Sequence, residues 1–131
     1  MVIDTSVLIA LALNEPTRDR LLIAMGTGSE RVLSSVSLLE TGIILRARFF
    51  ERGTLLLNGL LDELISEVVA FDEVQAKSAI VAFGRFGKGM GHRAQLNFGD
   101  CAVYALAASR RDAVLATGRD FAATDLSSVP Y

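Results

Sequence analysis

Short apolar segments that alternate with helical ones are the feature of this sequence that most restricts its fold. The expected strands are 1–4, 31–33, 67–71 and 113–117, and the expected helices are 5–13, 17–25, 34–50, 54–66, 72–86 and 99–111. Strands this short and this apolar are typical of a parallel sheet that is covered on both faces. The alternation therefore predicts an α/β fold with a central parallel sheet flanked by helices on both faces.

Local signals set several boundaries. Pro16 ends the first helix, Gly26 ends the second, and Asp72 is expected to cap the fifth. The glycine-rich residues 84–91 match neither a Walker loop nor a dinucleotide-binding fingerprint, so they are interpreted as a plain flexible loop.

Composition narrows the class of protein. A chain of 131 residues with 51% hydrophobic and 21% charged side chains predicts one folded domain, residues 1–131. The longest apolar runs have seven or eight residues, which is too short to cross a membrane. The early Asp4 makes a secretory signal unexpected. One cysteine, Cys101, excludes an internal disulfide and suits a reducing, cytoplasmic location; together with the single His92 it is too little for a zinc cage.

The net charge of −2 does not reveal a partner. Eleven of the thirteen basic residues are Arg, however, and Arg is the better donor to phosphate and carboxylate groups. The global charge therefore leaves nucleic acid open as a ligand.

Four acids are expected to meet at one edge of the sheet. Asp4 ends the first strand, Asp120 follows the last one, and Glu40 and Asp100 lie in the opening turns of two helices. Helices that follow parallel strands begin at the carboxyl edge of the sheet, where ligands bind. Each acid also has a structural interpretation: Asp4 as a helix cap, Glu40 in a capping box with Ser37, Asp100 at a helix dipole, and Asp120 in a turn.

The neighbours of Glu40 favour a functional interpretation. On a helix it shares a face with Val36, Ile43, Ile44 and Ala47, which predicts that its carboxylate lies in a buried apolar stripe. Clustered buried carboxylates repel one another unless an Arg, a shared proton or a divalent cation compensates them. Oxygen ligands without imidazole or thiolate favour Mg²⁺ or Mn²⁺.

Four segments around these acids resemble the acidic motifs of PIN-domain ribonucleases, and in particular those of VapC toxins from bacterial VapBC toxin–antitoxin pairs. These segments are Val2-Ile3-Asp4-Thr5-Ser6, Ser37-Leu38-Leu39-Glu40, Leu96-Asn97-Phe98-Gly99-Asp100-Cys101 and Thr117-Gly118-Arg119-Asp120-Phe121. The similarity spans the chain in order and with appropriate spacing.

The resemblance implies a PIN-like fold and Mg²⁺- or Mn²⁺-dependent cleavage of RNA. Asp4 and Asp100 would be the most direct metal ligands, while Glu40 and Asp120 would bind a second ion or hold its waters. A cation held by carboxylates activates water for attack on a phosphodiester and leaves a 5′-phosphate. The resemblance also implies a homodimer and an antitoxin of the VapB type, which would insert a side chain near the acids and block the site.

Other polar residues are candidates for support of the site or contact with RNA. They are Thr5, Ser6, Thr117, Asp125, Arg93 and Arg119, with Arg46 and Arg48 as further bases and His92 as a loop residue. Cys101 is interpreted as core packing.

Two other functions compete with the nuclease. A PIN-like module that binds RNA or protein without cutting would not need all four acids. A phosphatase with an aspartyl nucleophile at Asp4 would need a second Asp two residues later, and position 6 is Ser.

Overall fold

The computed structural model describes residues 1–26 and 30–131 and contains a four-stranded parallel sheet. The strands are β1 (Val2–Ile3), β2 (Val32–Ser34), β3 (Glu67–Val69) and β4 (Val114–Leu115), in the spatial order β3-β2-β1-β4. Val2 lies opposite both Val32 and Val114, so β1 pairs with β2 and with β4 at the same residues.

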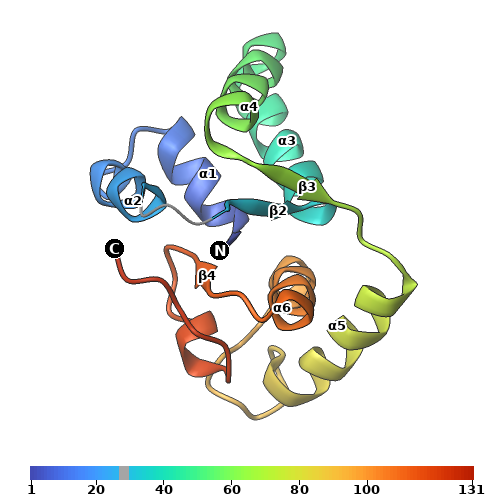
Figure 1. Cartoon of the computed structure of the whole chain (residues 1–131). Coiled ribbons are helices and arrows are strands. Elements are labelled where there is room, and N and C mark those ends of the chain that lie inside the picture. The colour runs from blue at the N-terminus through green and yellow to red at the C-terminus, as the bar shows by residue number, and fades with distance from the viewer. Residues whose placement is uncertain (27–29) are drawn as a thin grey trace.

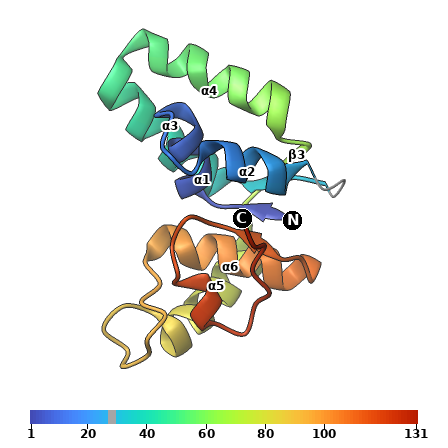
Figure 2. The same cartoon turned by 90° about the vertical axis from the view of Figure 1, so that its left-hand side faces the viewer.

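Helices cover both faces of this sheet (Figure 1). They are α1 (Thr5–Ala12), α2 (Arg18–Met25), α3 (Ser35–Phe49), α4 (Glu51–Leu64), α5 (Glu73–Phe86) and α6 (Phe98–Arg110), with a short 3₁₀ turn, η1 (Phe121–Ala123). Figure 2 shows α1 to α4 on one side of the strands and α5, α6 and η1 on the other. The predicted α/β fold is confirmed.

Successive side chains along the strands point to opposite faces of the sheet and so divide the core into two clusters. Val2, Val32 and Val114 pack against α5, α6 and η1, whereas their successors Ile3, Leu33 and Leu115 pack against α1 and α2. Successive side chains of a strand point to opposite faces, so strands of two or three residues can supply both clusters. No helix in the described part of the chain is long and apolar enough to cross a membrane.

The prediction that the apolar face of α3 is buried is wrong. The side chains that α3 buries are Ser37, Thr41 and Leu45, whereas Ile43 is 60% exposed. Glu40 is half-buried at the border of this outer stripe. The small Ser and Thr side chains pack against the neighbouring elements, with the Thr41 hydroxyl donating to the Ser37 carbonyl, and the larger apolar side chains remain outside.

The connection after α5 and the start of α3 also differ from the prediction. Helix α5 ends at Phe86, as predicted, but the connection that follows it is held by backbone hydrogen bonds between its two ends rather than being a plain loop. The Ser37–Glu40 capping box is absent because Ser34 caps α3, its hydroxyl accepting from the Val36 amide.

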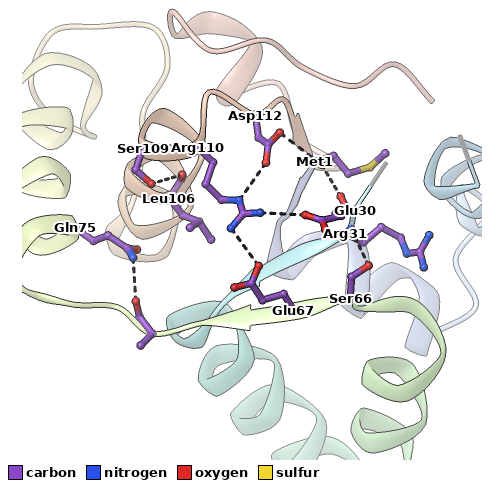
Figure 3. Close-up of polar contacts among 11 residues, drawn as sticks. Met1, Glu30, Arg31, Ser66, Glu67, Gln75, Leu106, Ser109, Arg110 and Asp112 are labelled. Carbon is purple, nitrogen blue, oxygen red and sulfur yellow. Dashed lines mark hydrogen bonds and ion pairs between the residues drawn. The ribbon is translucent and has the colours of Figure 1, made fainter. Parts of the chain in front are cut away.

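One arginine ties together the amino-terminal edge of the sheet (Figure 3). Arg110, at the end of α6, donates to Glu67 at 3.1 Å, Glu30 at 3.2 Å and Asp112 at 3.3 Å. These acids precede or begin three different strands, so Arg110 joins segments that are distant in the sequence.

We expect Arg110→Ala to lower the free energy of unfolding by about 1 kcal/mol, because three carboxylates lose a shared cation. Urea unfolding at low and high salt measures this effect, which salt should reduce. Arg18→Ala is the matched control, since within residues 1–26 and 30–131 Arg18 pairs only with the exposed Asp19. Equal losses in the two variants would contradict a structural role for the Arg110 network.

Candidate active site

The fold brings the four predicted acids to the carboxyl-terminal edge of the sheet. Asp4 directly follows β1. Asp120 lies beyond the end of β4, which is the neighbour of β1 in the sheet. Glu40 is carried by α3, which starts where β2 ends, and Asp100 lies in the first turn of α6. The four residues therefore come from four separate segments that meet at one edge.

Residues 4 to 6 connect three of these segments by hydrogen bonds. The Asp4 carboxylate caps α1 by accepting from the Ser6 amide at 2.9 Å. The Thr5 hydroxyl donates to Glu40 Oε2 at 2.7 Å, and the Ser6 hydroxyl accepts from the Thr117 amide at 3.0 Å. The geometry of Asp4 is therefore compatible both with a role as the cap of α1 and with a role in the acid site.

Asp100 is held by a capping box at the start of α6. The Asn97 amide donates to Asp100 Oδ2 at 2.8 Å, and the Asp100 amide donates to Asn97 Oδ1 at 2.9 Å. The preceding Gly99 lies against Glu40, because a Cβ atom at Gly99 would stand 2.8 Å from Glu40 Oε2. A side chain at position 99 would therefore displace the Glu40 carboxylate from its place beside α6.

Burial and mutual repulsion make the site unfavourable for negative charge. Asp4 is only 7% exposed, and burial raises its pKa, with a smaller contribution from Glu40. Burial also raises the pKa of Asp100 to about 6, and the charges of Asp4, Asp120 and Glu40 add to that rise. All four acids are therefore close enough to interact electrostatically.

The chemistry of this group fits a hard divalent cation. Within the described residues, no Lys or Arg forms an ion pair with any of the four acids. Carboxylate oxygens are the ligands that Mg²⁺ and Mn²⁺ prefer. Among the same residues no three acids, His or Cys are grouped closely enough to form an ion site as they stand.

Asp125 lies in a different cluster from the four acids. It accepts from the Tyr104 hydroxyl at 2.7 Å and pairs with Arg85 at 2.9 Å, which links the chain beyond η1 to α5 and α6. Arg46 pairs with Glu51 on the outer surface, and the Arg48 guanidinium lies over the Phe49 ring.

The remaining candidates are placed as follows. Arg93 and Arg119 are exposed, and neither forms an ion pair within the described part of the chain. The His92 ring makes a T-shaped contact with the Phe86 ring. Cys101 is buried, and desolvation raises its pKa to about 11, which fits the packing interpretation. The sequence analysis missed the close contact of Gly99, although its position beside Asp100 was a signal.

Sequence comparisons place this arrangement in a known family. A family model described as PIN domain matches residues 1–126. Ribonuclease VapC of Mycolicibacterium smegmatis is 42% identical over 129 residues, which cover 98% of this chain and 99% of that protein. Ribonuclease VapC30 of Mycobacterium tuberculosis is 40% identical and is covered to 98% of its length.

Solved structures agree on the fold. VapC20 of Mycobacterium tuberculosis, described as a toxin that cleaves the sarcin–ricin loop, superposes with a TM-score of 0.79 at 17% identity and covers 98% of this chain and 97% of its own. The DNA-bound VapBC of Salmonella typhimurium gives 0.72 at 20% identity, covering 98% and 95%. The chain belongs to the PIN-domain family and, within it, to the VapC ribonucleases.

Asp100→Asn should stabilise the metal-free protein above pH 6. A carboxyl group whose folded pKa exceeds its unfolded value holds its proton more tightly when folded, so stability falls as pH rises from about 4 to about 6. The neutral Asn avoids this loss, and we expect a gain on the order of 1 kcal/mol at pH 8 after screening by solvent. Thermal unfolding in EDTA measures it.

The gain should shrink as the pH falls below about 4, because the Asp100 carboxyl then becomes protonated in the unfolded state as well as in the folded one. Asp62→Asn makes the same exchange at an exposed position of α4 and serves as the control. A gain that did not change with pH would show that repulsion among the acids is not its cause.

Proposed function

We propose that this chain is an endoribonuclease that depends on a divalent cation and acts as the toxin of a type II toxin–antitoxin pair. The observation that carries the proposal is the set of four mutually repelling carboxylates at the sheet edge, with no cation paired to them in the described residues. The names of the relatives, Ribonuclease VapC and VapC30, support RNA as the substrate.

In this proposal Asp4 and Asp100 bind the ion directly, while Glu40 and Asp120 complete the site. Thr5 orients Glu40 through its hydroxyl, and Ser6 fixes the segment that leads to Asp120 through the Thr117 amide. Asn97 holds Asp100 in its capping box. When bound, a divalent cation supplies activation of water and neutralises charge at the phosphorus centre. Dependence on such an ion is typical of the family, and we propose Mg²⁺ or Mn²⁺.

We infer a VapB-type antitoxin as the protein partner. Solved neighbours include toxin–antitoxin complexes from Klebsiella pneumoniae and Salmonella typhimurium. An antitoxin side chain inserted beside the acids would prevent binding of the ion or of RNA. Action on cellular RNA also implies that the protein works in the cytoplasm, as one domain formed by residues 1–131.

Incubation of the purified protein with total RNA tests the nuclease directly. With Mg²⁺ or Mn²⁺ we expect discrete cuts with 5′-phosphate ends, which sequencing of the new ends identifies. EDTA should abolish them, and Asp100→Asn should reduce the rate by at least roughly a hundredfold, because a direct ligand of the ion is lost. Asp62→Asn should cut like the native chain.

Cuts that persist in the Asp100→Asn variant would show that the acid cluster is not the site. Absence of cutting by metal-loaded protein that is free of antitoxin would favour the alternative, a PIN-like module that binds RNA or protein without cleaving it.

We also propose that a second copy of the chain covers the exposed apolar face formed by α3, α5 and the start of α6. Phe98 is 79% exposed and projects between two hollows of about 250–280 Å³. Ile43 lines one hollow and Ile80, 73% exposed, lines the other. A projecting ring beside hollows can pair with itself about a two-fold axis, as homodimer interfaces require.

Ile43→Glu combined with Ile80→Glu should convert a dimer to a monomer, since it would place charges inside an apolar interface. Light scattering coupled to size-exclusion chromatography measures the mass. The control is Ile23→Glu on α2, which is 74% exposed and lies outside this face. A monomeric native chain, or a dimer unaffected by the double variant, would contradict the proposal.

A further inference from the structure

Basic charge in this chain is concentrated in one segment. Residues 74–99 form the longest stretch of the sequence without an Asp or Glu, although the whole chain has a net charge of −2. This stretch carries five basic side chains: Lys77, Arg85, Lys88, His92 and Arg93. Two of them are neutralised on α5, where Lys77 pairs with Glu73 and Arg85 with Asp125.

The other three lie on the connection between α5 and α6, which we name the basic loop and define as residues 87–96. Figure 2 shows it as an extended loop that leads to the beginning of α6. Lys88 and Arg93 are exposed. Among the described residues no carboxylate pairs with either of them, so both are available to an anionic ligand.

The basic loop is closed at its base. The Lys88 amide donates to the Leu96 carbonyl at 2.9 Å, and the Leu96 amide donates to the Phe86 carbonyl at 2.9 Å. Ala94 and Leu96 are buried in the core and anchor the returning strand of the loop. The left-handed backbone at Gly89 and Gly91 makes the turn between these anchors.

His92 braces the interior of the loop. Its Nδ1 accepts from the Ala94 amide at 3.1 Å, and its ring makes a T-shaped contact with the Phe86 ring, with the centroids 5.0 Å apart. Gln95 donates from its side-chain amide to the His92 carbonyl. These contacts fix the backbone on either side of Arg93, so binding by its guanidinium costs less loop ordering.

The basic loop is joined to the acid cluster through the capping box at the start of α6. Asn97, which follows the loop directly, forms the capping box with Asp100. Asp100 in turn lies within electrostatic range of Asp4, Glu40 and Asp120. The basic loop, with Lys88 and Arg93 unpaired among the described residues, therefore leads directly into the segment that positions Asp100.

We propose that the basic loop binds phosphates of the RNA strand that flank the scissile bond, with Lys88 and Arg93 as the contacting side chains and His92 as the residue that holds the loop in shape. The proposal rests on the proposed ribonuclease function. Contacts to phosphate position a nucleic acid without reading its sequence. The loop therefore sets RNA affinity and its salt dependence, whereas the acids carry out the cleavage.

The test combines Lys88→Ala with Arg93→Ala and measures binding of a short fluorescein-labelled single-stranded RNA by anisotropy. All proteins carry Asp100→Asn, so that the RNA is not cut. We expect Kd to rise roughly tenfold, and the slope of log K against log salt to fall by about 1.4, or about 0.7 for each lost phosphate contact. Lys77→Ala with Arg18→Ala removes one Lys and one Arg elsewhere and should change neither quantity.

Steady-state cleavage by chains with Asp100 intact gives a second readout. The loop variant should raise KM and leave kcat within about twofold, because the acids are untouched. If the native chain cuts RNA while the loop variant and the control bind RNA equally, the loop proposal is overturned and the nuclease stands. If the loop variant binds more weakly but the native chain cuts nothing, the nuclease fails and the loop remains an RNA contact.

Discussion

The strands of this protein are so short that β1, β2 and β4 must each supply side chains to both sides of the core. Val2 and Ile3 are the whole of β1, and they point to opposite faces, as do Val32 with Leu33 and Val114 with Leu115. All other elements depend on this alternation, because the helices bury their apolar sides only where the sheet presents apolar side chains. The buried side chains of α6 pack mainly in the cluster that contains Val2, whereas those of α1 pack in the cluster that contains Ile3.

The same shortness places the polar residues. A strand that ends after two residues delivers Asp4 to the carboxyl edge immediately, and the hydrogen bonds of Thr5 and Ser6 extend from there to α3 and to the segment after β4. The edge that receives the acids is consequently destabilised by their repulsion, whereas the opposite edge is tied by Arg110 to three acids. The charges at the two edges therefore have opposite effects: at one edge they pair and stabilise the fold, and at the other edge they repel one another.

Much of this arrangement could be predicted from the sequence. The alternation of strand and helix, the cap at Asp72 and the convergence of Asp4, Glu40, Asp100 and Asp120 follow from local patterns and from the rule that parallel strands end at one edge. The apolar stripe of α3 could not, because Ile43 and Ile44 have the spacing of a buried face and yet remain outside. Periodicity shows that a face is apolar, but it does not show whether the face meets the core or another molecule.

By itself the sequence determined the fold class, the four acids and the family, because these are encoded in residue types at particular positions along the chain. Only the tertiary structure decided which neighbours those residues have. It placed Glu40 against Gly99 and Thr5, paired Asp125 with Arg85 and Tyr104, and left Lys88 and Arg93 without a partner among the described residues. Such contacts join residues far apart in the chain, and their distances depend on how all the layers pack together.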